Sequence, residues 1–361
     1  MASETTEAPM LVWRGVCHHY TPGKPILREL DLSVAAGEIL CLLGPSGCGK
    51  TTALRTVAGF EPITAGEITL DGTVVSRPGM VTPPEQRDVG LVFQEAALFP
   101  HLSIAENIAF GIWRRPKAEQ AQRVGALLAM VALEGHGSKL PHQLSGGQRQ
   151  RAALARAMAP SPRVILLDEP FSALDADLRR SLSREVRRIL KDGGVTAVLV
   201  THDQQEAFAM ADRTALLHNG RLEQVAGARE LYQQPATPFV AGFIGEGAFY
   251  PATVRKGNCD TGFHQWPARD DWAEGDAVQV FLRPEAVRIA REGSLEAEVV
   301  ELDYRGGVSF LRARLREWPE VVLDVRDTGR GHRELGEKIH LHMPEETPPV
   351  FKHRGEVETK P

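Results

Sequence analysis

The sequence lacks the features that mark secreted or metal-rich proteins. Its four cysteines, Cys17, Cys41, Cys48 and Cys259, are widely spaced and form no Cys-x-x-Cys pair. This spacing indicates neither a disulfide framework nor a zinc site, and it favours reduced thiols in a cytosolic protein. The neighbours His18 and His19 have no further ligand residues at suitable spacing, so no metal site is predicted there.

Long apolar runs are also missing. A membrane-spanning helix needs about 18 to 20 apolar residues, and the longest candidates, Ile39–Leu43 and Val164–Leu167, have only the length of strands. The polar, acidic segment Met1–Met10 has no basic region followed by an apolar one, so no signal peptide is predicted. We therefore expect a cytoplasmic protein that reaches a membrane only through partner subunits.

The sequence also has no excess of positive charge. It carries 42 basic and 47 acidic residues, for a net charge of −5. The basic residues between Arg180 and Arg188 are interrupted by Glu185, which is typical of a solvated helix face. A nucleic-acid partner is therefore not predicted.

A chain of 361 residues predicts two domains. Residues 11–240 alternate short apolar runs with helical patterns, which predicts an α/β domain over residues 1–240 with a mostly parallel sheet. The predicted strands are Ile39–Leu43, Val89–Phe93, Val164–Asp168, Ala197–Thr201 and Thr214–Leu217. The predicted helices are Gly49–Ala58, Ala118–Val131, Gln148–Met158, Ala176–Leu190 and Gln204–Ala211. The period-two pattern of Gly66–Gly72 adds a small antiparallel piece.

The pattern changes after about residue 241, where no long helical pattern remains. The strand-like runs are Phe249–Val254, Val278–Leu282, Leu295–Leu302, Phe310–Leu315 and Val321–Val325, separated by glycine, proline and charged residues. This pattern predicts a small all-β domain over residues 241–361.

A phosphate-binding motif lies between a predicted strand and a predicted helix. Its residues are Gly44, Pro45, Ser46, Gly47, Cys48, Gly49, Lys50 and Thr51, followed by Thr52, and they match G-x-x-x-x-G-K-[ST]. The glycines let backbone N–H groups and the helix N-terminus surround phosphate oxygens. Lys50 is expected to neutralise the β- and γ-phosphates, and Thr51 to offer its hydroxyl to Mg²⁺.

Two carboxylates follow the apolar run Val164–Leu167. Asp168 is placed to hold Mg²⁺ through water, and Glu169 is placed to act as general base on an attacking water. Alone, the pattern fits a strand before an acidic helix cap equally well. Together with the phosphate-binding motif it predicts ATP hydrolysis.

The segment Leu144–Arg151 reads Leu-Ser-Gly-Gly-Gln-Arg-Gln-Arg. Ser145 and Gln148 form a capping-box pattern, and Gly146 and Gly147 leave an anion site at the helix start. Here the chain resembles the ATP-binding cassette (ABC) ATPases, whose signature is LSGGQ. The resemblance implies a P-loop NTPase (RecA-like) cassette that works as a homodimer, with the signature of one copy covering the γ-phosphate of ATP on the other.

Further positions match this family. Tyr20, placed before the first strand pair, resembles the aromatic residue that stacks on adenine, with an ordinary strand-end tyrosine as the alternative. Gln94 resembles the glutamine that touches Mg²⁺ or water, and His202 the histidine on the γ-phosphate. Ser172–Asp175 resembles the segment that crosses the dimer interface, which assigns Asp175 to the nucleotide site. The resemblance also implies an inserted helical subdomain over about residues 95–160.

The C-terminal part resembles a TOBE domain through Leu282–Glu285, which reads Leu-Arg-Pro-Glu. This resemblance implies an OB-like β fold and the ATPase subunit of an importer, peripheral to the cytoplasmic face of the inner membrane. The linker Phe243–Ala252 and the segment Leu98–His101 resemble the ferric iron importers, so ferric iron is the predicted cargo. Sulfate, molybdate, polyamine and sugar remain alternatives. Lys256–Trp272 matches little of the family.

The implied partners are a second copy, a membrane permease and, indirectly, a periplasmic or surface solute-binding protein. A soluble ABC ATPase acting on nucleic acid or ribosomes is the remote alternative. Such proteins carry a long coiled-coil insertion or two cassettes, and this chain has one phosphate-binding motif. A catalytically dead scaffold is disfavoured because Glu169 and His202 are both present.

Overall fold

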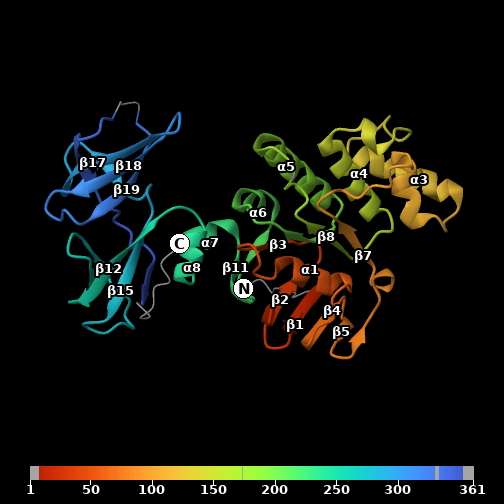
Figure 1. The fold of residues 1–361 in the computed structure, drawn as a ribbon, viewed down its shortest axis with the longest axis horizontal. Helices are drawn as coiled ribbons and strands as arrows, with labels where there is room; N and C mark the ends of the chain where they lie inside the picture. Colours follow the sequence, from red (N-terminus) through yellow and green to blue (C-terminus); the bar gives the residue numbers. More distant parts are fainter. Residues whose placement is uncertain (1–7, 173, 330–332, 353–361) are drawn as a thin grey trace, which may run out of the picture. The chain divides into compact units, whose positions relative to one another are not determined.

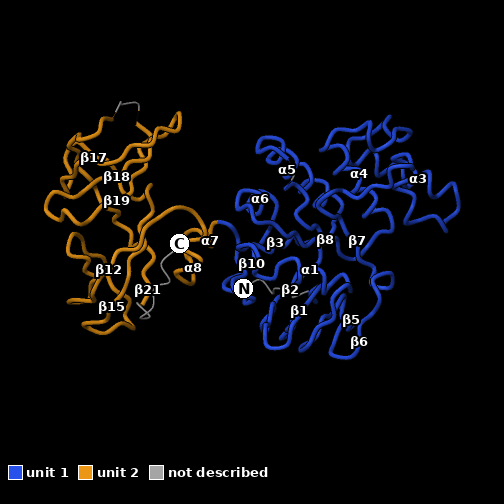
Figure 2. Tube along the Cα trace, in the orientation of Figure 1, with its two compact units in different colours: residues 1–228 blue, residues 229–361 orange. Residues whose placement is uncertain are grey.

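The structure is a computed structural model that describes residues 8–172, 174–329 and 333–352. Part of the predicted N-terminal segment Met1–Met10, and Ala173 of the predicted interface segment, lie outside the described residues. The chain divides into two compact units, residues 1–228 and 229–361 (Figure 2). The domain limit predicted at 240/241 falls within α8 (Pro238–Phe243).

A six-stranded sheet forms the centre of the first unit. Its order is β11 (Arg221–Ala226), β10 (Arg213–His218), β3 (Ile39–Leu43), β9 (Thr196–Val200), β8 (Val164–Asp168) and β7 (Val89–Val92). Every neighbouring pair is parallel except β10 and β11. Every residue of β3 and β9 is buried, as expected for strands covered on both faces. The predicted mostly parallel sheet is confirmed.

Helices cover both faces of this sheet. Figure 1 shows α1 (Lys50–Ala58) on one side, and α5 (Ala176–Asp192) and α6 (Gln204–Met210) on the other. The face that bears α1 shares one apolar core with a second, antiparallel sheet. This core holds β3 and α1 rigidly on either side of the loop that joins them.

The antiparallel sheet has the order β2 (Leu27–Val34), β1 (Leu11–His18), β4 (Ala65–Leu70), β5 (Thr73–Arg77) and β6 (Met80–Val81). β4 and β5 confirm the antiparallel piece predicted at Gly66–Gly72. β1 was not predicted from the sequence. Its register shifts against β2 between Trp13 and Val16, where Gly15 has φ 56°, so its burial pattern loses strict alternation.

Three helices lie between β7 and β8: α2 (Ile104–Ala109), α3 (Lys117–Met130) and α4 (Gly146–Met158). A capping box starts α2, in which Ser103 and Glu106 bond each other's backbone N–H groups. Short 3-10 turns at Pro84–Gln86, Phe110–Ile112 and Pro141–Gln143 complete the helical elements of this unit. No helix in the described part of the chain is long and apolar enough to cross a membrane.

The second unit begins within α7 (Ala228–Gln233) and contains two five-stranded sheets. The first has the order β14 (Gln265–Pro267), β13 (Asn258–Asp260), β12 (Ala248–Arg255), β15 (Ala277–Leu282) and β21 (Val350–Lys352). The second has the order β16 (Arg288–Ala290), β20 (Lys338–His342), β17 (Leu295–Tyr304), β18 (Ser309–Leu315) and β19 (Val322–Asp327). Both sheets contribute to one apolar core, which confirms the predicted all-β domain.

Arg283, in the predicted TOBE motif, has a structural role in this unit. Its side chain is 7% exposed and donates to the carbonyl oxygens of Ile244 at 2.7 Å and Tyr232 at 2.9 Å. Its guanidinium lies 3.7 Å from the centroid of the Tyr232 ring, a cation–π contact. The motif therefore ties the segment before β12 to the end of β15.

Candidate functional site

The loop Gly44–Gly49 joins β3 to α1 in a conformation that only glycine allows at two places. Gly44 has φ 154°, and a Cβ there would lie 2.2 Å from the carbonyl oxygen of Leu217. Gly49 has φ 104°, and its Cβ would lie 2.8 Å from the carbonyl oxygen of Ile26. No side chain caps the first turn of α1, and no acidic residue lies in it. The loop therefore presents free N–H groups and the positive end of a helix to an anion.

Lys50 folds back over this loop. Its side chain is 6% exposed, and its ammonium donates to the carbonyl oxygens of Gly44 and Pro45 at 2.8 Å each. The ammonium also lies 3.9 Å from the sulfur of Cys48. Burial raises the pKa of the Cys48 thiol, so the loop carries one positive charge and no compensating thiolate. The Lys50 ammonium can exchange these carbonyl oxygens for phosphate oxygens while it stays within the loop.

Thr51 and Asp168 meet at the end of β8. The Thr51 hydroxyl donates to the Asp168 carboxylate at 3.2 Å, and burial raises the pKa of Asp168. A hydroxyl and a carboxylate are the hard oxygen ligands that Mg²⁺ prefers. No group of three or more His, Cys, Asp or Glu side chains forms a metal cage among the described residues. Mg²⁺ fits this pair, because it is usually held by few protein ligands together with phosphates and water.

Glu169 and His202 face each other from the ends of β8 and β9. The His202 Nδ1 lies 3.2 Å from the Glu169 carboxylate. Glu169 has φ 46°, a left-handed conformation that is rare for a side-chain-bearing residue, and its N–H donates to the carbonyl of Val200 at 3.0 Å. Such strain occurs often at functional sites. From this backbone conformation the carboxylate reaches the imidazole of His202.

The signature segment starts α4 as a capped helix. Ser145 and Gln148 exchange the two bonds of a capping box, at 2.9 and 3.3 Å, which confirms that prediction. Gly146 occupies the first helical position. Gly147 is buried, and a Cβ there would lie 2.9 Å from Leu182 on α5. The glycine therefore allows close packing of α4 on α5 as well as leaving the helix start open.

Asp175 and Tyr20 occupy less central places. Asp175 caps α5, accepting from the N–H of Leu178 at 2.9 Å. Tyr20 lies in the connection between β1 and β2, not ahead of the first strand pair as predicted, because β1 was missed. It is 57% exposed, donates to Glu61 at 3.1 Å, and packs edge-on against His18 at 4.6 Å.

Gln94 is exposed and lies two residues beyond the end of β7. Among the described residues, no hydrogen bond joins Tyr20, Gln94 or Ser145 to Lys50, Asp168 or Glu169. The structure thus brings together the groups of the phosphate-binding loop and the two strand ends. It leaves the signature segment apart from them within one chain.

A side-chain network that flanks His202 was not predicted from the sequence. The Thr201 hydroxyl donates to Glu206 at 2.7 Å and accepts from the N–H of Asp203 at 3.0 Å. Arg179 on α5 donates to Asp203 at 2.7 Å and to the carbonyl of Leu174 at 2.9 Å. Burial raises the pKa of Glu206 to about 7. The sequence did contain a signal for part of this network. Asp203 stands at a predicted helix start and Glu206 follows three residues later, which is typical of a helix cap.

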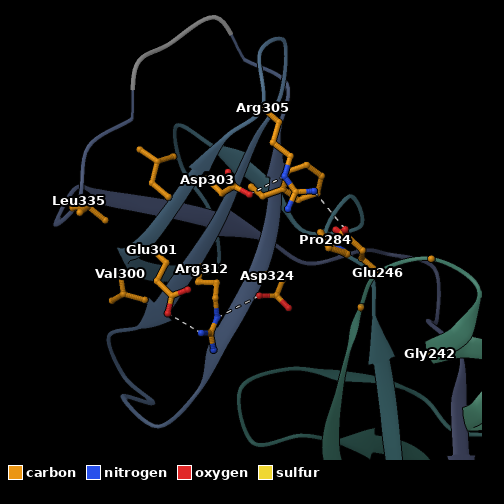
Figure 3. A pocket seen from close by; sticks show the side chains of 14 residues that line it. Gly242, Glu246, Pro284, Val300, Glu301, Asp303, Arg305, Arg312, Asp324 and Leu335 are labelled. Carbon is orange, nitrogen blue, oxygen red and sulfur yellow. Dashed lines mark hydrogen bonds and ion pairs between the residues drawn. The ribbon is translucent and has the colours of Figure 1, made fainter. Parts of the chain in front are cut away.

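A hollow of about 750 Å³ lies in the second unit (Figure 3). Its charged side chains pair with one another: Arg312 with Glu301 at 2.8 Å and with Asp324 at 3.6 Å, and Arg305 with Asp303 at 2.7 Å. Arg305 also covers the ring of Phe310 at 4.5 Å. The hollow is thus lined by satisfied ion pairs.

A glycine-rich loop between a buried parallel strand and a helix, with a lysine, a hydroxyl and two strand-end carboxylates, defines a nucleotide-binding site of the P-loop class. Comparison with known protein families leads to the same class. A family model described as ABC transporter matches residues 27–172, and one described as TOBE domain matches residues 280–351.

Relatives extend the match over most of the chain. A spermidine/putrescine import ATP-binding protein of Marinobacter nauticus is 43% identical and covers 88% of this chain and 89% of its own length. A sulfate/thiosulfate import ATP-binding protein of Chromobacterium violaceum is 45% identical over 82% of each chain. An Fe(3+) ions import ATP-binding protein of Rhizobium meliloti is 54% identical over 64% of this chain and 58% of its own.

A solved structure shares the fold. The structure of cbiO1 from Clostridium perfringens, part of the ABC transporter complex cbiONQ, matches with a TM-score of 0.58 and 25% identity over 64% of this chain and 93% of its own. The chain belongs to the ATP-binding proteins of ABC importers that carry a TOBE domain. The predicted fold class is confirmed. The prediction that the chain is most similar to ferric iron importers is not confirmed. Relatives named for polyamine and sulfate import align over more of the chain than the relative named for Fe(3+) import.

Proposed function

We propose that this chain hydrolyses Mg-ATP as one half of a homodimer and drives a permease that imports a solute, at the cytoplasmic face of the membrane. The observation that carries the proposal is the pairing of Glu169 with His202 at 3.2 Å beside the Lys50, Thr51 and Asp168 group. This pairing provides a base and its orienting partner next to a phosphate-binding loop.

Each site residue has its own role in the proposed binding and hydrolysis of ATP. Lys50 and the N–H groups of Gly44–Thr51 hold the β- and γ-phosphates, and Thr52 continues this turn of α1. Thr51 and Asp168 would hold Mg²⁺, which supplies neutralisation of phosphate charge when bound. Glu169 takes the proton of the attacking water, and His202 orients the γ-phosphate. Tyr20 stacks on adenine, and Gln94 orients the water. Ser145, Gly146, Gly147 and Gln148 act on ATP held by the second copy, with Asp175 at the interface.

Replacing Glu169 by Gln tests the hydrolytic role. Loss of a general base lowers rates by about 10² to 10⁴, and the isosteric amide leaves the P-loop contacts unchanged. We expect kcat to fall by that factor while the Kd for ATP stays within about threefold. Glu67→Gln is the matched control, because Glu67 is an acidic residue of β4 that pairs with Arg14 outside the site. Equal turnover of Glu169→Gln and Glu67→Gln would refute the proposal.

For the cargo, we propose ferric iron. The linker Phe243–Ala252 and the 54% identity to the Rhizobium meliloti protein named for Fe(3+) import support this choice. Polyamine is the second candidate, because the relative named for spermidine/putrescine import aligns over 88% of the chain. The test reconstitutes the chain with its permease and solute-binding protein in lipid and measures ATPase activity with each solute. Stimulation by spermidine or sulfate alone would discard iron and keep the importer.

A further inference from the structure

The backbone that begins two residues after Gln94 has an unusual conformation. Ala96 has φ 58° and Ala97 has φ 43°, so two successive alanines adopt the left-handed region. L-residues with a Cβ disfavour this region, whereas glycine enters it freely. Ala96 is 6% exposed. A strained turn at this place persists only if surrounding contacts hold it.

Within the turn, the N–H groups of Ala96 and Ala97 donate to the carbonyl oxygens of Phe93 at 3.1 Å and Glu95 at 2.6 Å, and Arg156 adds side-chain contacts from α4. Its guanidinium donates to the carbonyl oxygens of Ala97 at 2.7 Å and Ala96 at 3.5 Å, and it lies 5.5 Å from the centroid of the Phe99 ring. Within the described residues it forms no ion pair with an acidic side chain, and burial lowers its pKa. The charge of Arg156 is therefore satisfied by the backbone of the strained turn.

Arg156 belongs to the last turn of α4, the helix that starts at the signature segment. A helix rises about 1.5 Å per residue, so α4 is a rigid connection from Ser145 to the turn after Gln94. Its apolar residues Ala152–Ala155 are buried, which fixes the helix in the surrounding core.

We propose that Arg156 is a positioning residue: it holds the left-handed turn Ala96–Ala97 and thereby sets the place of Gln94 relative to the signature helix. The inference rests on the proposed role of Gln94 in orienting the attacking water. When Arg156 is removed, the turn relaxes to a right-handed or extended form and Gln94 moves with it.

Arg156→Met tests this in the full chain with Mg-ATP. Arginine's long stem is roughly preserved in methionine, while both carbonyl contacts are lost. We expect kcat to fall about tenfold, with the KM for ATP within twofold because the P-loop contacts are untouched. Adding Ala96→Gly and Ala97→Gly to this variant should restore kcat to within about threefold of the native chain, since glycine adopts the turn without the tether.

Arg123→Met is the matched control. Arg123 also donates to backbone carbonyls at the end of α4, those of Met158 at 2.8 Å and Ala159 at 3.4 Å, but it does not touch Ala96 or Ala97. The kcat of Arg123→Met should equal that of the native chain. Gln94→Ala should lower kcat, and Gln94→Ala with Arg156→Met should be no worse than the slower single variant, because the two act through one group.

The outcomes separate the two proposals. An inactive native chain refutes the proposed function. A Gln94→Ala variant with native turnover refutes the proposed role of Gln94 and, with it, the positioning role of Arg156. If turnover needs Gln94 but is unchanged in Arg156→Met, the positioning role of Arg156 is refuted and the proposed function is not. The positioning role of Arg156 is also refuted if the two glycines fail to restore kcat to Arg156→Met, or if Arg123→Met loses as much activity. In both cases the proposed hydrolysis of ATP still stands.

Discussion

Cys48 lies inside the phosphate-binding loop. Its side chain is 5% exposed, its sulfur lies 3.9 Å from the Lys50 ammonium, and burial raises its pKa. The nucleophile is the thiolate, so alkylation should be slow and accelerate with pH. Because an adduct would fill the loop that receives phosphate, we expect hydrolysis to stop and bound ATP to protect.

The measurement is ATP turnover after treatment with N-ethylmaleimide. It is made with and without ATP added before the reagent. Cys48→Ser is the control and should resist the reagent, since the remaining cysteines lie outside the loop. Full activity in a chain shown by mass to be alkylated at Cys48 would contradict the prediction.

Glu206 provides a pH-dependent contribution to stability. Burial raises its pKa to about 7 from 4.5, and its Oε1 is buried without a partner, where a proton can sit. The folded chain therefore binds more protons than the unfolded chain between about pH 4.5 and 7. Stability falls across this window as pH rises, by an amount of about 3 kcal/mol when complete.

Glu206→Gln removes this titration. We expect the variant to be more stable than the native chain by about 2 to 3 kcal/mol at pH 8, with the gain shrinking as pH falls toward 5. Urea unfolding of both chains at pH 5, 6.5 and 8 measures the difference. A difference that does not change with pH would show that Glu206 titrates normally in the folded chain.

At the scale of elements, Arg87 fastens α1 to the antiparallel sheet. Its guanidinium is 2% exposed and donates to the carbonyls of Thr56 and Val57 at the end of α1, and to that of Val75 on β5. Burial lowers its pKa to about 10. It sits at the helix C-terminus, where a positive charge is favourable.

Arg87→Met should cost at least about 3 kcal/mol of unfolding free energy, because buried carbonyls left without a donor cost about 1 to 3 kcal/mol each. Urea unfolding of the first unit measures it. The control is Arg77→Met, since Arg77 lies on β5 but is exposed and should change stability by less than about 0.5 kcal/mol. Similar losses in both variants would contradict the assignment.

Local sequence patterns predicted elements better than they predicted contacts between elements. β3 and β8 have the predicted bounds, because apolar runs ending at turn residues specify buried strands. β1 was missed because Gly15 and a register shift break its alternation. The Thr51–Asp168 and Glu169–His202 pairs follow from parallel strands ending at one edge. Arg156 and Arg87 carry no motif, because each acts on backbone carbonyls from other parts of the chain.

At the scale of the whole molecule, one chain holds both halves of the proposed site without joining them. Within the described residues, no hydrogen bond connects Ser145 with the loop Gly44–Thr51. If two copies pair symmetrically, each site takes its loop from one copy and its signature segment from the other. Two chains with different lesions can then share one intact site.

This arrangement predicts complementation between inactive variants. Lys50→Ala and Ser145→Arg should each abolish turnover alone, since every site in either homodimer carries a lesion. In a mixed dimer, one site combines the native loop of the Ser145→Arg chain with the native signature of the Lys50→Ala chain. Random equal mixing makes half of the dimers mixed, so turnover should recover to roughly a quarter of the native value. A mixture as inactive as its components would mean that each chain completes its own site, because only a site shared between copies can be restored by exchange.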